Sequence, residues 1–506
     1  MIHTLSWIDL TVIFVYLTGV VLFGVSFYRK NKTKEAFMTG NRNIPSWVIA
    51  MSIFATFVSS ISFLALPAKA YATNWNAFVF SLTIPIALIF SWKFFIPLYR
   101  NVNSVSAYTY LEKRFGRWAK LYASVCYLLT QIMRTGTILF LLALPLHVLL
   151  GWDIVTIILC TGIAVAVYST LGGILAVVWT DAIQGIILIT GALVCLIFLL
   201  FSMPEGPVQT WNIAWNDGKM SLGSFDLTDW TSSTFWVVFA YGIFINLQNY
   251  GIDQNYIQRY MSARSEREAK TSALFGGLLY LPVSFLFFMI GAALYAYYQV
   301  NMAELPAEIA VAGMEDRIFP FFIVDKLPAG LTGILIASIL SAGMSTVSTS
   351  LNSGATIVLT DFFRSEKRNH SSRKSMTILY LSTLGITVSG VLIAIMMIQV
   401  KSVLDAWWDM ASIFSGGMLG LLLLGYFSKK ATNMSAAIAV AAGILVIIWM
   451  SLSPLYFNTE GLLCFRSRLH TQLTIVMGTT VIFLTGFLLS KFSISRSFGN
   501  ERELKD

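Results

Sequence analysis

Long apolar runs separated by charged loops are the feature that most limits what this chain can fold into. A helix that crosses a bilayer needs about 20 mostly apolar residues, and the chain offers thirteen such runs. Their approximate ranges are 7–27, 47–70, 77–98, 119–149, 153–171, 175–202, 233–255, 272–299, 328–359, 376–399, 404–427, 432–452 and 470–490. Charged residues make up only 12% of the chain, about half of their share in soluble domains. The sequence therefore predicts an all-α polytopic membrane protein with about 13 transmembrane helices.

The charges of the connecting loops predict the orientation. Lys and Arg gather after the first, third, seventh, ninth, eleventh and thirteenth runs, and the loop after the seventh holds Arg259, Arg264, Arg267 and Lys270. With thirteen spans all these loops lie on one side, and basic loops are typical of the cytoplasmic side. We therefore expect the N-terminus outside and the C-terminus inside. In such a chain the net charge of +9 does not indicate nucleic-acid binding. The expected surroundings are the lipid bilayer, and no obligate protein partner is evident.

The second run contains an unusual cluster of hydroxyl groups. Thr56, Ser59, Ser60 and Ser62 lie within seven residues, where a lipid-facing helix would carry Leu or Val. A helix can open at membrane depth only where protein or a cavity covers the freed backbone groups. The cluster is therefore compatible with a broken transporter helix that carries a binding site. It is equally compatible with a seam of small residues between packed helices.

Arg134 lies alone near the middle of the fourth run. A charged residue at this depth is costly and usually functional, and the planar guanidinium suits a carboxylate. We favour a substrate anion as its partner. The alternative is a structural ion pair with one of the few acids in apolar runs, which are Asp181, Asp253 and Asp409.

Asp181 follows a Gly172-Gly173 pair by eight residues. The two glycines predict a tight turn between helices, so Asp181 should lie about a turn and a half into the sixth run. A carboxylate there is a candidate ligand for a hard cation, which prefers oxygen donors. It could instead be a partner for Arg134 or a helix cap.

The seventh run loses its apolar pattern at residues 246–251, which include Asn246 and Gln248. Five spans separate this run from the second one. Transporters built from inverted repeats carry broken helices at corresponding positions of the two halves. The spacing therefore predicts a five-plus-five inverted repeat with a second break at 246–251.

A third polar stretch occupies residues 341–353 in the ninth run. Ser345, Ser348 and Thr349 recur with the spacing of one helix face, and Thr346 and Ser350 form an adjacent stripe. Such hydroxyls serve equally in a packing seam. Together with the cluster near Ser59 and with Asp181, they favour a sodium pocket.

Two motifs link these stretches to a known family. The run GG-x4-V-WTD-xx-Q at 172–184 and the run DQ-xx-IQRY at 253–260 resemble signatures of the sodium:solute symporter family, and most closely its bacterial sodium/sialic acid symporters. The resemblance implies a leucine-transporter-type fold with ten core helices in two inverted repeats. The core would be 47–427 of one membrane transport domain, preceded by an extra helix and basic loop (1–46) and followed by two helices and a cytoplasmic tail (428–506).

The resemblance also implies the binding sites. Sodium site one would use Ala55, Val58, Ala342, Ser345 and Thr346, and sodium site two would use Asp181, Ser345, Ser348 and Thr349. The sugar carboxylate would meet Ser59, Ser62 and Arg134. The candidate substrate-binding residues are Phe57, Ser59, Ser60, Ser62, Ala77, Ser81, Arg134, Asn246 and Gln248. The sequence departs from the relatives at Phe57, where they carry a threonine, and at Ser81, where they carry a glutamine.

The expected function is sodium-coupled secondary active symport of sialic acid (N-acetylneuraminate) across the bacterial cytoplasmic membrane by alternating access, with one or two Na+ ions. A different carboxylate or a neutral sugar is the alternative substrate, and a transporter-fold membrane sensor is a less favoured alternative. An enzyme is not expected, because the sequence carries no hydrolase, P-loop or metal motif. The histidines lie at the ends of runs or in loops: His3, His147, His370 and His470.

Overall fold

The computed structural model describes residues 6–307, 309, 315–363, 372–399, 403–456 and 465–492. Within these ranges the regular structure is helical, as predicted. The α-helices are α1 (Trp7–Ser26), α2 (Lys34–Thr39), α3 (Ser46–Phe57), α4 (Leu66–Ala72), α5 (Val79–Leu82), α6 (Ile84–Phe90), α7 (Ile96–Val102), α8 (Thr109–Phe115), α9 (Arg117–Leu150), α10 (Ile154–Phe201), α11 (Pro207–Asn216), α12 (Phe235–Ile252), α13 (Gln254–Ser262), α14 (Glu266–Val300), α15 (Ile318–Lys326), α16 (Leu331–Ile357), α17 (Ser372–Met396), α18 (Val403–Phe427), α19 (Asn433–Tyr456) and α20 (Leu473–Phe492).

Each of the thirteen predicted runs falls on helical structure. By length and apolarity, ten helices among the described residues could cross a membrane, or eleven if the bent pair of α3 and α4 counts as one span. The difference arises because α10 contains two predicted runs and because α12 is not among the ten. The number of thirteen crossings therefore stays a prediction.

The turn predicted inside α10 lies at Gly173, whose φ of 58° and ψ of −157° interrupt the helix. A side chain is strained in this backbone region, and a Cβ atom on Gly173 would lie 2.6 Å from the Asn31 side chain. Asn31 also donates to the carbonyl of Leu171. The glycine pair thus ends the first half of α10 and places Asp181 in the second half, fully buried.

The break predicted in the second run lies where the hydroxyl cluster begins. Helix α3 ends at Phe57, Val58 has extended backbone angles (φ −80°, ψ 122°), and the chain continues through a π-helical turn (Ile61–Ala65) into α4. The two halves are bent by 60°. The hydroxyl cluster therefore marks a broken helix, as the first of its two interpretations predicted. The binding site at the break stays a prediction.

The second break lies further along the chain than the sequence suggested. Helix α12 continues to Ile252, and the extended residue is Asp253 (φ −72°, ψ 122°), which caps α13 by accepting from the backbone N–H of Asn255. The prediction of a break at 246–251 was therefore wrong by a few residues. Asn246 and Gln248 lie inside α12, where polar side chains had been mistaken for the end of a helix.

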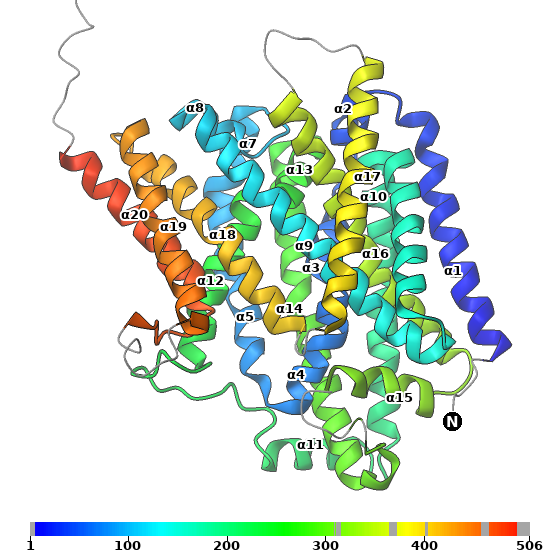
Figure 1. Cartoon of the computed structure of the whole chain (residues 1–506). Helices are drawn as coiled ribbons and strands as arrows, with labels where there is room; N and C mark the ends of the chain where they lie inside the picture. Colours follow the sequence, from blue (N-terminus) through cyan, green and yellow to red (C-terminus); the bar gives the residue numbers. More distant parts are fainter. Residues whose placement is uncertain are drawn as a thin grey trace, which may run out of the picture.

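The helices that carry polar stretches lie in the middle of the molecule. Figure 1 shows α1 at one edge and α19 and α20 at the opposite edge, with α3, α9 and α16 between them. The helix α1 is fixed to the core by Asp9, whose carboxylate accepts from the backbone N–H groups of Gly330 (2.8 Å) and Gly333 (2.7 Å) at the start of α16. A carboxylate at this position satisfies free N–H groups and complements the helix dipole.

Candidate functional site: two polar pockets at a broken helix

The break in the second run leaves carbonyl groups at the end of α3 without their usual helical partners. Side chains from two other helices bind them. The Ser345 hydroxyl donates to Ala55 O (3.1 Å), the Thr346 hydroxyl donates to Val58 O (3.3 Å), and the Arg134 guanidinium donates to Thr56 O (2.7 Å). The break is thus a point where α9 and α16 meet α3.

The structure brings all five residues predicted for sodium site one together. Besides their bonds to α3, Ser345 and Thr346 each donate to Ala342 O, both at 3.1 Å. Three carbonyl oxygens and two hydroxyl oxygens therefore converge in a buried place. Neutral oxygen donors of this kind suit a hard cation, so the residues present fit a sodium ion.

The residues predicted for sodium site two are Asp181 and three hydroxyl residues of α16. The Thr349 hydroxyl lies 3.4 Å from Asp181 Oδ2, and Ser345 and Ser348 lie on the same face of α16 as Thr349. Asp181 Oδ1 is buried and has no hydrogen-bond partner in the part of the chain that the structure describes. An ionised oxygen left in this state is costly, so the donor set also fits a cation here.

Arg259 is the functional candidate that the sequence interpretation misplaced. It was counted with the cytoplasmic loop charges, but it lies in α13 and is fully buried, while Arg264 and Arg267 are exposed. Its guanidinium forms an ion pair with Asp181 Oδ2 at 2.7 Å. The counter-ion of Asp181 is therefore Arg259 and not Arg134.

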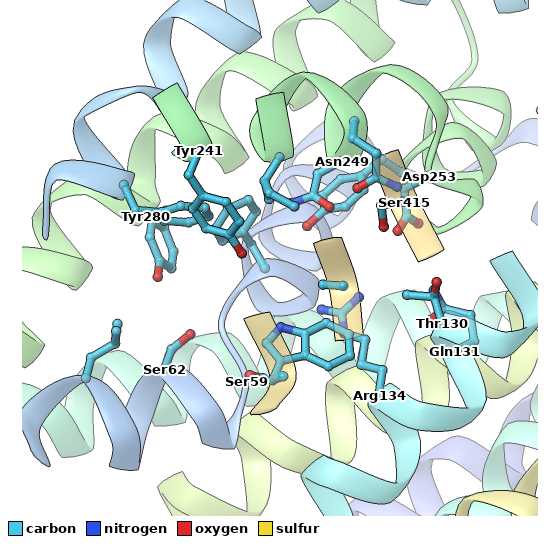
Figure 2. A pocket seen from close by; sticks show the side chains of 18 residues that line it. Ser59, Ser62, Thr130, Gln131, Arg134, Tyr241, Asn249, Asp253, Tyr280 and Ser415 are labelled. Atoms are coloured by element: carbon cyan, nitrogen blue, oxygen red, sulfur yellow. The ribbon is translucent and has the colours of Figure 1, made fainter. Parts of the chain in front are cut away.

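A cavity of about 100 Å³ opens beside the break. Figure 2 shows Ser59, Ser62 and Arg134 on one side and Tyr241, Tyr280, Asn249 and Asp253 on the other. Of the predicted substrate-binding residues, five line this cavity: Phe57, Ser59, Ser62, Arg134 and Gln248. The structure thus joins residues of the two broken segments around one space, although they are almost two hundred residues apart in the sequence.

Arg134 presents its guanidinium to this cavity. One nitrogen binds Thr56 O, and the guanidinium carbon lies 6.0 Å from the centre of the Trp407 ring. Among the side chains that the structure describes, no carboxylate lies within salt-bridge distance of Arg134. The Asp409 side chain, one of its predicted alternative partners, lies outside the described residues. The geometry leaves nitrogens of Arg134 available to an anion in the cavity.

The comparisons with known proteins agree with this geometry. Residues 37–443 match the family model described as "Sodium:solute symporter family". This chain belongs to the sodium:solute symporter family. It is 33% identical to the sodium/sialic acid symporter SiaT of Proteus mirabilis, over 88% of this chain and 90% of the relative. It is 31% identical to the sodium/sialic acid symporter NanT of Aliivibrio fischeri, over 96% of this chain and 92% of the relative.

Solved structures place the fold of this symporter. A sodium-coupled sialic acid symporter, described as substrate-bound and outward-open with a novel sodium site, matches with a TM-score of 0.87 and 30% identity, over 96% of this chain and 98% of that one. The nucleobase-cation symporter Mhp1 in a closed conformation matches with a TM-score of 0.55 at 15% identity, over 90% of this chain and 94% of that one. The latter likeness concerns the fold alone. The predicted leucine-transporter-type fold is confirmed.

The two departures from the relatives' pattern have different surroundings in this symporter. Phe57 forms an apolar wall of the cavity, with its ring centre 5.8 Å from that of Tyr250 in a stacked arrangement and 4.4 Å from that of Tyr280. Ser81 is buried behind the wall, where its hydroxyl lies 2.7 Å from that of Ser284. Only Phe57 therefore changes the surface that a substrate would touch.

Four predicted substrate-binding residues do not line the cavity. Ser60 donates to Ile138 O on α9 (3.4 Å), and Asn246 donates to Thr83 (3.0 Å). Ala77 lies at a separate pocket with Lys69 and His470, and Ser81 bonds to Ser284 as above. The hydroxyl cluster and the polar end of α12 both contribute side chains to the cavity, but the sequence did not reveal which face of each helix meets it.

Several lining residues were missed by the sequence interpretation. Thr130 and Gln131 precede Arg134 by four and three residues, so they share its helix face. That spacing was a signal that could have found them. Asn249 lies within the predicted break at 246–251, and Asp253 was named as a possible partner of Arg134, although neither was predicted to line the cavity. The other missed residues have no local cue, and they are Leu66, Phe80, Tyr241, Ile245, Tyr256, Tyr280, Trp407, Ala411 and Ser415.

Proposed function

We propose that this chain imports sialic acid (N-acetylneuraminate) together with sodium, by alternating access, across the bacterial cytoplasmic membrane with its N-terminus outside. The observation that carries the proposal is the guanidinium of Arg134. It lines a polar cavity beside Ser59 and Ser62, and no carboxylate among the described side chains lies within salt-bridge distance of it. Asp253 lines the same cavity and interacts electrostatically with Arg134 from beyond that distance. The two sialic acid symporters at 33% and 31% identity support the identity of the anion.

The proposed roles follow from the contacts at the break. Ala55, Val58, Ala342, Ser345 and Thr346 would hold sodium at site one, where the ion supplies positive charge to the freed carbonyls. Arg134 binds the carboxylate with the nitrogens that Thr56 O leaves available. A fork-shaped donor fixes the orientation of a carboxylate as well as its affinity. The ion and the anion are thus held by neighbouring peptide units of one broken helix.

The size of the cavity is consistent with a site that must open. Ligand pockets usually enclose roughly 300–1,000 Å³, whereas this cavity encloses about 100 Å³. A nine-carbon sugar acid therefore requires the lining helices to move apart. Such a movement is the alternating access expected of transporters with broken helices.

A second candidate substrate is a smaller, less polar carboxylate. The observation that favours it is the apolar wall of Phe57, Tyr250 and Tyr280. Sodium-coupled monocarboxylate transporter 2 of Bos taurus is 28% identical over 89% of this chain and 73% of the relative. Arg134 would serve that carboxylate equally well, so only the part of the cavity beyond Arg134 distinguishes the two substrates.

The energetics depend on the number of sodium ions. A tenfold sodium gradient supplies about 1.4 kcal/mol per ion, and each net charge moved inward at −100 mV gains about 2.3 kcal/mol. One sodium with one carboxylate is electroneutral and gains only the first amount. Two sodium ions carry one net charge and gain about 5 kcal/mol, enough for several-thousandfold accumulation.

The test is uptake of radiolabelled N-acetylneuraminate into proteoliposomes, with inward gradients of sodium, potassium or protons. We expect uptake with sodium only. Stimulation by an inside-negative potential would mean more than one sodium per carboxylate, and independence of potential would mean one. Sodium-driven uptake of labelled lactate or pyruvate, with no uptake of the sugar, would favour the smaller carboxylate. No uptake of any carboxylate under a sodium gradient would refute the proposal.

A further inference from the structure

Arg259 forms hydrogen bonds with oxygen atoms that are predicted to bind sodium at site two. Its terminal nitrogen donates to Asp181 Oδ2 and to the Thr349 hydroxyl, both at 2.7 Å, and its Nε donates to the Ser52 hydroxyl at 2.7 Å. The other terminal nitrogen donates to Asn255 O at 2.7 Å. Two of these partners, Asp181 and Thr349, are predicted ligands of the second sodium ion.

The two oxygens of Asp181 are in opposite states. Oδ2 accepts from Arg259 and from Ser52, the latter at 2.6 Å. Oδ1 is buried and has no partner among the described residues. Each buried oxygen of a carboxylate needs a hydrogen-bond donor or a cation. Oδ2 has such partners, and Oδ1 still requires one. The charge that a cation would seek at Oδ1, however, is already neutralised by Arg259.

We propose that Arg259 is an internal cation that competes with sodium at Asp181 and so sets the sodium affinity of the second site. The guanidinium binds Oδ2 at 2.7 Å. A sodium ion on Oδ1 of the same carboxylate would therefore lie on the order of 6 Å from its charge, close enough for strong Coulomb repulsion. At an effective dielectric constant near 20, the repulsion between two positive charges at that distance weakens binding by about a hundredfold. Removing the positive charge of Arg259 should therefore strengthen sodium binding by a similar factor.

This inference deepens the proposed function, because it takes sodium site two as a real site. It also explains how the sodium affinity of the second site could be set, which the list of predicted ligands does not. With Arg259 in place, the Asp181–Arg259 ion pair has no net charge. Sodium then binds at the second site only when its concentration is high. The number of ions carried per sugar then depends on one side chain of α13.

The experiment measures sodium binding directly and needs no substrate. The thermal unfolding midpoint of the purified protein is titrated with NaCl against KCl at constant ionic strength. For Arg259→Gln we expect low stability in KCl, because Asp181 is left unpaired, and recovery at a sodium concentration about a hundredfold below that required by the wild type. In Arg259→Gln/Asp181→Asn the gain should vanish, since the second site then lacks its carboxylate.

The matched control is Arg114→Gln, because Arg114 donates to the backbone carbonyls of Ser428 and Lys429, away from both sodium sites. Its sodium midpoint should equal that of the wild type. If Arg259→Gln does not fold, Ser52→Ala decides. It keeps both charges but removes the hydroxyl that accepts from Arg259 and donates to Asp181. The guanidinium is then held less tightly beside Asp181, which has lost one donor, and the sodium midpoint should fall about tenfold. An unchanged midpoint in the folded variant, or a gain that persists without Asp181, overturns the inference. A gain in sodium affinity without sugar uptake would retain the inference and refute the substrate.

Discussion

Replacing Arg134 by Gln tests the substrate assignment most directly. The Gln side chain can still donate one N–H to Thr56 O, the bond that Arg134 makes at 2.7 Å. It removes the positive charge and the second arm of the fork, which are the parts available to a carboxylate in the cavity. The backbone of the break should therefore stay in place while the anion loses its partner.

The expected loss follows from the hydrogen bonds removed. A hydrogen bond to a charged group contributes about 1.5–3 kcal/mol, and Arg134 would supply two. Its side chain is only partly buried, so the lower end of the range applies. A loss of about 3 kcal/mol raises the dissociation constant of N-acetylneuraminate by about 150-fold. Arg134→Lys, which keeps the charge but not the fork, should lose about tenfold.

The assay is equilibrium binding of labelled N-acetylneuraminate to the purified protein in NaCl, with sodium binding followed separately by thermal unfolding. We expect the sodium response of Arg134→Gln to be retained, because the five residues of site one are untouched. Arg114→Gln serves again as the charge-matched control. A dissociation constant within fivefold of the wild type, with sodium dependence intact, would refute the role of Arg134.

Three other variants test separate parts of the structure. Thr346→Val removes the hydroxyl that donates to Val58 O and Ala342 O, and the sodium concentration for half-maximal uptake should rise at least about tenfold; an unchanged value would exclude Thr346 from site one. Phe57→Thr removes the ring stacked on Tyr250. Because Phe57 is only partly buried, thermal stability should fall by less than the roughly 3–5 kcal/mol of a core Phe, and competition binding should favour N-acetylneuraminate over lactate. Asp9→Asn weakens the cap of α16 and should cost about 1–2 kcal/mol in thermal unfolding, whereas Asp153→Asn at the exposed start of α10 should cost less.

Local chemistry made the first break and the α10 turn predictable. Hydroxyls in place of apolar residues at Thr56, Ser59 and Ser62 indicated carbonyl groups without helical partners. The glycine pair before Asp181 indicated a turn with a backbone conformation that other residues rarely adopt. In both cases the residues that indicate the feature lie at the feature itself in the sequence. The structure has the extended residue at Val58 and the positive φ at Gly173 accordingly.

The misplacement of Arg259 has a physical cause. Its neighbours in the sequence include Gln254, Gln258 and Arg264, which together look like a solvated loop. In the fold, Gln254 bonds to the backbone of Val105 and Ala107, and Gln258 donates to Met38 O. The side chains of Gln254, Gln258 and Arg259 bond to segments between 78 and 220 residues away, and the shortest of these separations is that of the Arg259–Asp181 ion pair. No local pattern contains that information.

The sequence also did not predict which face of each helix lines the cavity. Ser59 and Ser62 line the cavity while Ser60 turns to α9, and Gln248 lines it while Asn246 binds Thr83. A hydroxyl or an amide is suited to either task, because both tasks satisfy a buried polar group. Residue type therefore predicted the segment of the site, and only the packing of α9, α12 and α16 determined the members.

The arrangement at the end of α3 gives a physical reason for coupling between the ion and the anion. Ala55 O and Val58 O belong to proposed sodium site one, and Thr56 O between them holds Arg134. A sodium ion that draws the two outer carbonyls together also fixes the middle one, and thereby the nitrogens of Arg134 that face the cavity. Because linkage is reciprocal, the factor by which sodium strengthens sugar binding must equal the factor by which sugar strengthens sodium binding. Measuring both factors in the wild type, and finding both reduced together in Thr346→Val, would trace the coupling to this one turn of backbone.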